Sequence, residues 1–119
     1  MKTVLVVEDD KNQGLLYEQE LSLEGYNVML AKNGKEAIAR VEECVPDIIV
    51  MDITMPTMDG IEAMGKILAK HSKIPIIINT AYSSYKDNFM TWSADAYIVK
   101  SSDLTELKNK IKEMLNINA

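Results

Sequence analysis

The stretch of sequence that decides the fold is Thr3-Val4-Leu5-Val6-Val7-Glu8-Asp9-Asp10. Its first five residues form an unbroken apolar run that is rich in β-branched side chains. Continuous rather than alternating hydrophobicity is typical of a strand that is buried on both faces, as in a parallel sheet. Three carboxylates follow the run directly, so we expect this strand to end in a cluster of negative charge.

Similar apolar runs recur along the chain at roughly even spacing. They are Asn27–Leu30, Ile48–Met51, Ile74–Ile78 and Ala96–Val99. Between the runs lie segments in which apolar residues repeat every three or four positions, which is typical of amphipathic helices. The pattern is therefore β-α repeated five times. It predicts a doubly wound open α/β sheet with helices on both faces, forming one domain over residues 1–119.

Three of the helical segments carry a start signal, an Asn or Asp followed three residues later by Glu. The pairs are Asn33 with Glu36, Asp59 with Glu62, and Asp103 with Glu106. Each pair predicts an N-cap at its first residue. The first helix is expected at about Asn12–Glu24, with Gly25 as its C-terminal stop. Segment Ser83–Ser93 contains poor helix formers and predicts a short or irregular helix.

Parallel α/β sheets bind ligands outside the carboxyl ends of their strands. The residues at these ends are Glu8, Asp9, Asp10, Asp52, Thr80 and Lys100. Carboxylates that are brought together repel one another unless a cation neutralises them, and Mg²⁺ prefers such oxygen ligands. A carboxylate can also accept a phosphoryl group, whose oxygens suit a hydroxyl and a lysine. Asp10 alone is more simply explained as an acid at a helix N-terminus.

The composition excludes several classes of protein. Hydrophobic residues make up 47% and charged residues 26%, which excludes a disordered chain, and no apolar run approaches a membrane span. The formal net charge of −5 disfavours a general nucleic-acid-binding surface. Cys44 is the only cysteine, so we expect no internal disulfide and a cytoplasmic location. It also lies on an apolar helical row with Ala37 and Val41, so we expect its side chain to be packed.

The combination of motifs resembles a known family. It comprises Val4-Leu5-Val6-Val7-Glu8-Asp9-Asp10, Asp52-Ile53-Thr54-Met55-Pro56-Thr57-Met58-Asp59-Gly60, Thr80-Ala81 and Ala94-Asp95-Ala96-Tyr97-Ile98-Val99-Lys100. Over the whole chain it resembles the receiver domain of two-component response regulators, in the single-domain form typified by the chemotaxis regulator. The resemblance implies the flavodoxin-like strand order 2-1-3-4-5, which is also the strand order of the chemotaxis regulator.

The resemblance also implies a phosphorylation site. Asp52 would accept a phosphoryl group from a phosphohistidine on a sensor kinase or phosphotransfer protein. Mg²⁺ would be bound by Asp9, Asp52 and the backbone carbonyl of Thr54, with Glu8 acting through a water. Lys100 would contact the phosphoryl oxygens. The chain would thus be a phosphoacceptor rather than an enzyme acting on other substrates.

Switching is implied by the same resemblance. The hydroxyl of Thr80 would move toward the phosphoryl group, and the aromatic ring of Tyr97 would turn inward. The surface made by the 83–93 segment, the last strand and the last helix would then recruit a downstream protein. We expect no direct contact with nucleic acid or membrane, and either a monomer or a phosphorylation-dependent dimer.

The chain departs from the family pattern near two of these positions. Ser101 follows Lys100 where the family usually has a proline in a cis bond; a cis bond to serine costs ~3 kcal/mol, so we expect trans or a strained exception. The stretch from Thr80 to Tyr97 is shorter than usual, which again predicts a short or irregular fourth helix. The output surface implied by the resemblance would contain Tyr97 and, if they are exposed, Phe89 and Trp92.

Two further side-chain roles are open at this point. Phe89 and Trp92 are either core residues or exposed anchors for a partner. Thr54 and Tyr82 flank the path of water to the phosphate in this family, so they are expected to tune the lifetime of the phosphorylated state.

Three other functions fit parts of the pattern. A Mg²⁺-dependent phosphohydrolase would need an Asp nucleophile after the first strand, with a second Asp two residues later, and Glu8-Asp9-Asp10 does not fit. A flavin-binding electron carrier would need a hydroxyl- and glycine-rich loop where these acids stand. A degenerate receiver would only bind a partner, although all the site residues are present.

Overall fold

The computed structural model describes residues 1–51, 58–80, 95–99 and 103–117, but not the side chains of residues 58–61 and 117. The described part contains five strands and four helices. Their bounds are β1 Thr3–Val7, α1 Lys11–Leu23, β2 Asn27–Ala31, α2 Gly34–Glu43, β3 Ile48–Met51, α3 Met58–Lys70, β4 Ile76–Thr80, β5 Ala96–Val99 and α5 Thr105–Ile117. The predicted short or irregular helix within 83–93 lies outside the described residues.

All five strands are parallel and form one sheet in the order β2-β1-β3-β4-β5. This order confirms the predicted doubly wound architecture. Strand β1 lies between β2 and β3, and its side chains from Val4 to Val7 are almost completely buried. Burial on both faces explains why the run at the start of the sequence is continuously apolar.

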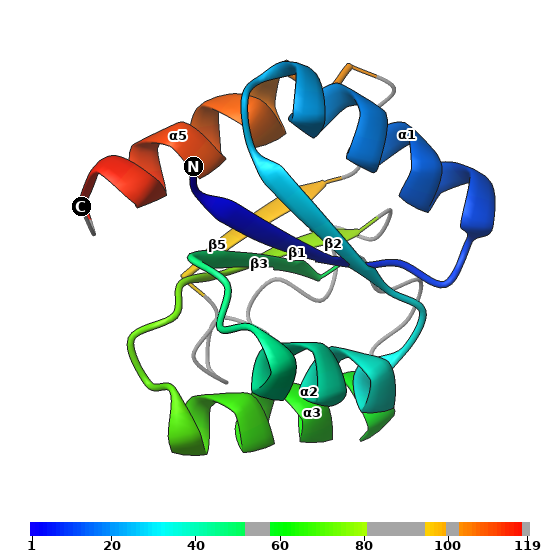
Figure 1. Cartoon of the computed structure of the whole chain (residues 1–119), viewed down its shortest axis with the longest axis vertical. Helices are drawn as coiled ribbons and strands as arrows, with labels where there is room; N and C mark the ends of the chain where they lie inside the picture. The colour runs from blue at the N-terminus through cyan, green and yellow to red at the C-terminus, as the bar shows by residue number, and fades with distance from the viewer. Residues whose placement is uncertain (52–57, 81–94, 100–102, 118–119) are drawn as a thin grey trace.

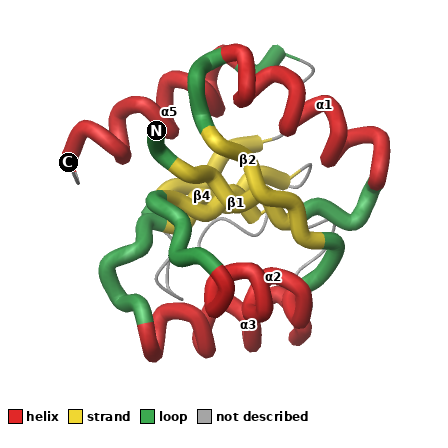
Figure 2. The backbone as a smooth tube through the Cα atoms, in the orientation of Figure 1, coloured by secondary structure: helices red, strands yellow, loops and turns green. Residues whose placement is uncertain are grey.

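The helices cover the two faces of the sheet in pairs, with α1 and α5 on one face and α2 and α3 on the other (Figures 1 and 2). Alternate residues of each strand point to opposite faces. Leu5 and Ile78 therefore pack in the core beside α2 and α3, whereas Val6 and Ile77 pack in the core beside α1 and α5. Packing of each helix on one face of the sheet explains why apolar residues recur every three or four positions in the helical segments.

The bounds of the fourth strand differ from the prediction. The apolar run predicted Ile74–Ile78, but β4 runs from Ile76 to Thr80. Its last residues, Asn79 and Thr80, pair with β5 and are buried despite being polar. Hydropathy alone ended the strand too early, because backbone pairing with β5 extends the sheet through these two residues.

Two predicted helix ends are confirmed. The side chain of Asn33 accepts a hydrogen bond from the Glu36 N–H at 2.8 Å and caps α2. Gly25 stands just after α1 with a φ of 93°, where a residue with a Cβ would be strained. Its N–H donates to the carbonyl of Ser22, which closes the last turn.

Two predicted N-caps are wrong. Helix α3 begins at Met58, two residues before the start that an N-cap at Asp59 predicts, so Asp59 lies in its first turn. The start can shift in this way because the first N–H groups of a helix need no intrahelical partner. Helix α5 begins at Thr105, and the carbonyl of Leu104 accepts the hydrogen bond from Lys108. Asp103 instead accepts hydrogen bonds from the backbone N–H and the hydroxyl of Thr105.

The prediction that Cys44 is packed is also wrong, because its side chain is exposed. Cys44 is the C-cap of α2 and has an extended backbone. Its side chain therefore does not continue the apolar face that Ala37 and Val41 form on the helix. Within the described part of the chain, no helix is long and apolar enough to cross a membrane.

Candidate functional site

The carboxyl ends of the parallel strands meet at one edge of the sheet, on the right in Figure 1. At the end of β1, Glu8 is buried and Asp9 is exposed. The Glu8 N–H donates to the carbonyl of Ala31 at 2.9 Å, which holds the chain beside β2 for one more residue. The Oε1 atom of Glu8 accepts a hydrogen bond from the Asp10 N–H at 3.1 Å. These contacts define the backbone path of residues 8–10, which we call the acidic turn.

Asp10 has a structural role in this turn. Its side chain accepts hydrogen bonds from the N–H groups of Asn12 and Gln13, at 2.9 and 3.1 Å, and caps the N-terminus of α1. This confirms the simpler explanation of Asp10 as an acid at a helix N-terminus. Glu8 and Asp9 are therefore the acids of the turn that remain as candidates for a metal site.

The register of the sheet places the other strand ends beside this turn. Val7 pairs with Met51, the last residue of β3, and Asp52 is the next residue in the sequence. Thr80 is buried at the end of β4 and pairs with Val99, which Lys100 follows in the sequence. The structure thus brings Glu8, Asp9 and Thr80 to one edge of the sheet.

Several predicted site residues lie outside the described residues. They are Asp52, Thr54, Tyr82, Phe89, Trp92 and Lys100. The same holds for Ser101, so the geometry of the Lys100-Ser101 bond remains a prediction. The roles of these residues therefore also remain predictions.

The acidic turn fits a hard divalent cation. Glu8 and Asp9 are adjacent carboxylates, one buried and one open to solvent. Mg²⁺ is usually held by one or two carboxylates and keeps several waters, so an exposed carboxylate at a strand end suits it. In the part of the chain that the structure describes, no group of three or more Asp, Glu, His or Cys residues surrounds a metal position. The third predicted acid, Asp52, lies outside this part of the chain.

Tyr97 lies in the middle of β5 and is partly buried. It pairs with Ile78 of β4 and packs against the core beside α2 and α3. Thr80 and Tyr97 thus belong to neighbouring strands, as the proposed switch requires. That the two side chains move together is a prediction from the family resemblance.

A buried polar contact near the site was missed at the level of sequence. The Asn79 Nδ2 group donates a hydrogen bond of 2.9 Å to the Tyr17 hydroxyl, and both residues are 2% exposed. The sequence contained one indication of a buried polar residue, namely that Asn79 directly follows the apolar residues Ile76, Ile77 and Ile78. The partner could not be identified from the sequence, because it lies 62 residues away in α1.

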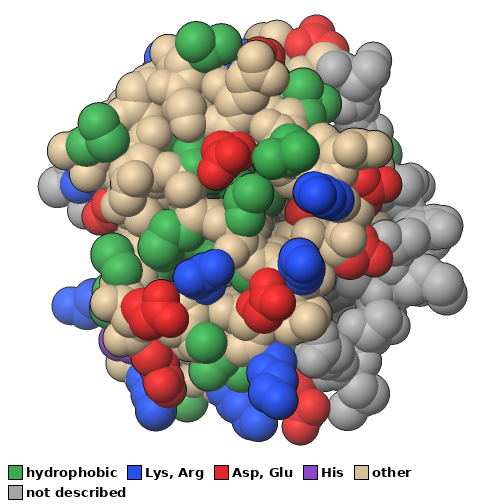
Figure 3. All heavy atoms as spheres, turned by 45° about the vertical axis from the view of Figure 1, so that its right-hand side comes forward, with side chains coloured by type: hydrophobic (Ala, Val, Ile, Leu, Met, Phe, Trp, Pro, Cys, Tyr) green, Lys and Arg blue, Asp and Glu red, His purple; other side chains and the backbone are tan. Residues whose placement is uncertain are grey.

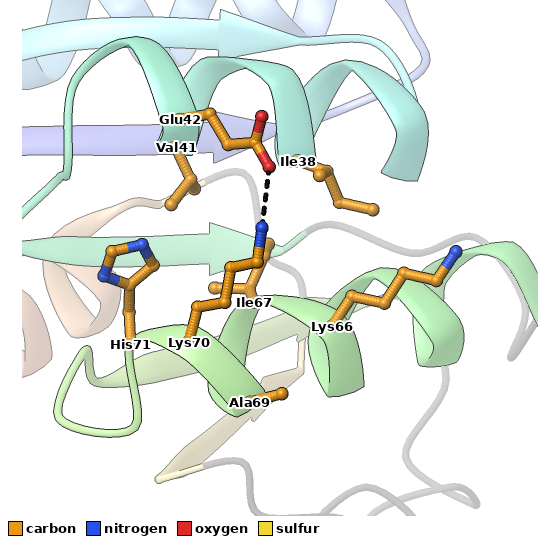
Figure 4. Close-up of a pocket in the computed structure, with 8 residues that line it drawn as sticks. All are labelled: Ile38, Val41, Glu42, Lys66, Ile67, Ala69, Lys70 and His71. Atoms are coloured by element: carbon orange, nitrogen blue, oxygen red, sulfur yellow. Dashed lines mark hydrogen bonds and ion pairs between the residues drawn. The ribbon is translucent and has the colours of Figure 1, made fainter.

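A cavity of about 280 Å³ lies between α2 and α3, away from the strand ends. Its walls include Ile38 and Val41 of α2 and Ile67 of α3, and Lys70 reaches across it to Glu42 at 3.2 Å (Figure 4). On the face shown in Figure 3, acidic and basic side chains are interspersed over this helix layer. The cavity contains none of the predicted site residues, so we do not assign it to the site.

Comparisons with known proteins agree with this geometry. The family model of the response regulator receiver domain matches residues 4–112. The structure of the response regulator TrrA from Thermotoga maritima, in complex with Mg²⁺-BeF, is 41% identical in sequence, with a TM-score of 0.87 and coverage of 96% of this chain and 99% of that chain. TrrA in complex with the histidine kinase ThkA is 42% identical, with a TM-score of 0.85 and coverage of 97% and 99%.

The curated relatives include longer proteins. The transcriptional regulatory protein PrrA from Mycobacterium leprae is 37% identical over 114 residues, which cover 94% of this chain and 49% of PrrA. The response regulator ArlR from Staphylococcus aureus is 36% identical over 117 residues, which cover 97% of this chain and 53% of ArlR. The chain spans about half the length of these two relatives. On the family match and these likenesses, the chain belongs to the response regulator receiver domain family.

Proposed function

We propose that this chain is a phosphoacceptor domain that receives a phosphoryl group on Asp52 and thereby switches a protein-binding surface. One observation carries the proposal. The parallel sheet brings Glu8, Asp9 and Thr80 to the edge at which β3 and β5 end, immediately before Asp52 and Lys100 in the sequence. The structure of TrrA with Mg²⁺-BeF supports the same chemistry in a similar protein.

The proposed reaction is transfer from a phosphohistidine. A carboxylate oxygen of Asp52 forms the new P–O bond while the P–N bond of the donor breaks. The imidazole nitrogen keeps the electron pair and is then protonated. When held by Asp9, Asp52 and the Thr54 carbonyl, with Glu8 acting through a water, Mg²⁺ supplies charge neutralisation at the phosphoryl oxygens. Lys100 adds a second positive charge there.

The phosphoryl group then biases the switch. It adds up to about two negative charges at the strand edge, which is enough to favour one position of a movable element over another. We propose that the Thr80 hydroxyl moves toward it and that Tyr97 follows. A surface that includes Phe89, Trp92 and Tyr97 would then bind the downstream protein, and Thr54 and Tyr82 would control how fast water removes the phosphate.

The donor is proposed to be a histidine kinase or a phosphotransfer protein, and α1 offers it a docking surface. Leu15 and Leu16 of α1 are 48% and 47% exposed, five and six residues after the capping Asp10. Neighbouring apolar side chains that form a contiguous exposed patch mark contact surfaces for proteins. The complex of ThkA with TrrA supports a kinase as the class of partner.

The docking role can be separated from the chemistry. A Leu16→Asp variant should lower phosphotransfer from autophosphorylated histidine kinases by about tenfold or more, since a charge would be desolvated in the contact. Its phosphorylation by acetyl phosphate should be unchanged. Leu23→Asp, at the far end of α1, is the matched control. Equal losses in both variants, or losses with acetyl phosphate, would count against docking through this part of α1.

The central proposal is tested by intact mass after incubation with acetyl phosphate and Mg²⁺. Wild-type protein should gain one phosphoryl group, and neither Asp52→Asn nor metal-free protein should gain it. Asp10→Asn, which keeps an oxygen to cap α1, should still be phosphorylated. No gain in wild-type protein that binds Mg²⁺ would favour a domain that only binds a partner.

We further propose that the chain acts in the cytoplasm as one receiver domain over residues 1–119, without direct contact with nucleic acid or membrane. It would be a monomer or a phosphorylation-dependent dimer. We also propose that it is not a phosphohydrolase. Turnover of p-nitrophenyl phosphate provides the direct comparison. Sustained release of p-nitrophenol that survives in Asp52→Asn would contradict the phosphoacceptor proposal.

A further inference from the structure

The hydrogen bond between Tyr17 and Asn79 joins helix α1 to strand β4 inside the core. The donor-acceptor distance of 2.9 Å is close to ideal, and both residues are 2% exposed. Tyr17 belongs to the same buried cluster as Val6, Val50 and Ile77. An apolar pair could occupy this position without any need for a polar partner, so the polar pair requires an explanation.

The position of this bond relates it to the proposed switch. Asn79 directly precedes Thr80 in β4. Because side chains alternate along a strand, Asn79 shares the face of Ile77 toward α1, and Thr80 shares the opposite face with Ile78. A movement of Thr80 that includes its backbone therefore pulls on the residue whose side chain is anchored to Tyr17.

The other end of the bond lies in the helix that follows the acidic turn. Helix α1 starts at Lys11, directly after the cap Asp10, and is held to α5 by an ion pair between Glu20 and Lys108 at 3.1 Å. Tyr17 is thus on an element that is anchored independently of β4. Displacement of the end of β4 away from α1 lengthens this hydrogen bond, and sideways displacement misaligns it, so either movement weakens a bond that is near its optimum in this structure.

We propose that Tyr17 and Asn79 are positioning residues that hold the end of β4, and with it Thr80, in the conformation of the unphosphorylated domain. This inference rests on the proposed function. The pair opposes the movement of Thr80, so its hydrogen bond sets part of the equilibrium between the resting and the activated state. Neither side chain is proposed to touch the phosphoryl group.

The test compares stability with activation in variants of the pair. Tyr17→Phe leaves the Asn79 amide buried without its acceptor, so the single variant should lose stability. The double variant Tyr17→Phe with Asn79→Leu replaces both partners by apolar groups and should recover most of that stability. Activation is measured as the affinity for beryllofluoride at saturating Mg²⁺, followed by ¹H–¹⁵N NMR.

We expect the double variant to bind beryllofluoride about three- to tenfold more tightly than wild type. The reason is that activation of the double variant no longer weakens the hydrogen bond that stabilises the resting state of wild type, and the factor is the net free energy of one hydrogen bond. The control Glu42→Gln with Lys70→Met breaks an ion pair between α2 and α3, on the opposite face of the sheet from Tyr17, and its affinity should equal that of wild type. An unchanged or weaker affinity in a stable double variant would overturn the inference.

A measurement on wild-type protein covers the case in which the double variant does not fold. Solvent exchange of the Asn79 carboxamide protons should become faster when beryllofluoride binds, since the hydrogen bond to Tyr17 weakens. Equal exchange in both states would overturn the inference while leaving phosphorylation of Asp52 intact. Failure of wild-type protein to bind beryllofluoride at all would instead refute the proposed function, and this inference with it.

Discussion

Val7 and Met51, the last residues of β1 and β3, are register partners in the parallel sheet. Each is joined by one peptide bond to an acid, Glu8 after Val7 and Asp52 after Met51. The pairing depends on backbone hydrogen bonds between strands that lie more than 40 residues apart in the sequence. It is the physical basis for assigning a cation and a phosphoryl group to this edge.

Removing one carboxylate from the acidic turn should weaken the binding of Mg²⁺. In Asp9→Asn, the concentration of Mg²⁺ that gives half-maximal phosphorylation by acetyl phosphate should rise about tenfold or more, because a charged oxygen ligand becomes neutral. Calorimetric titration with Mg²⁺ measures the same change directly. Asp10→Asn is the matched control, since Asp10 caps α1; a comparable effect there would argue for a general loss of negative charge instead of a specific ligand.

Thr80 should be needed for switching but not for accepting the phosphoryl group. Thr80→Ala removes the hydroxyl from a residue that is 2% exposed, whereas Thr80→Ser keeps it. Both variants should gain one phosphoryl group by intact mass. Only Thr80→Ala should lose the beryllofluoride-induced change in the ¹H–¹⁵N signals of β5 and α5. The same response in all three proteins would show that the switch does not use this hydroxyl.

Burial in the core beside α1 and α5 should contribute strongly to the stability of the domain. Ile111 of α5 is fully buried, so Ile111→Ala should lower the free energy of unfolding by about 2–5 kcal/mol through lost burial and the cavity that remains. Leu23 is 76% exposed, and Leu23→Ala should change it by less than about 0.5 kcal/mol. Urea unfolding measures both values. Similar losses in the two variants would contradict the packing described here.

Asp103 should contribute to stability in a pH-dependent way. The hydrogen bonds from the hydroxyl and the N–H of Thr105 hold the pKa of Asp103 below its ordinary value. A lowered pKa in the folded state stabilises the fold above the unfolded-state pKa of about 3.9, and this contribution disappears as the pH falls through the folded-state pKa. NMR titration should show the pKa rising in Thr105→Val. An unchanged value would mean that the Thr105 hydroxyl does not cause the shift.

Local features of the structure were predictable because they depend on residues that are near one another in the sequence. The cap at Asn33, the stop at Gly25 and the stripe of apolar residues in α5 each need only a few consecutive positions. The start of α5 was misplaced by one residue: the helix begins at Thr105, and the Asp103 side chain still accepts the hydrogen bond from the Thr105 N–H. A capping signal identifies a helix start only to within one or two residues.

By itself, the sequence determined that five apolar runs alternate with helices, and which residue types stand after each run, since hydrophobic periodicity is written in consecutive positions. Only the tertiary structure decided that β4 continues through Asn79 and Thr80, and that Asn79 meets Tyr17. The burial of a polar residue depends on the partners that the fold brings to it. Those partners come from distant parts of the chain, and packing of the sheet against its helices selects them.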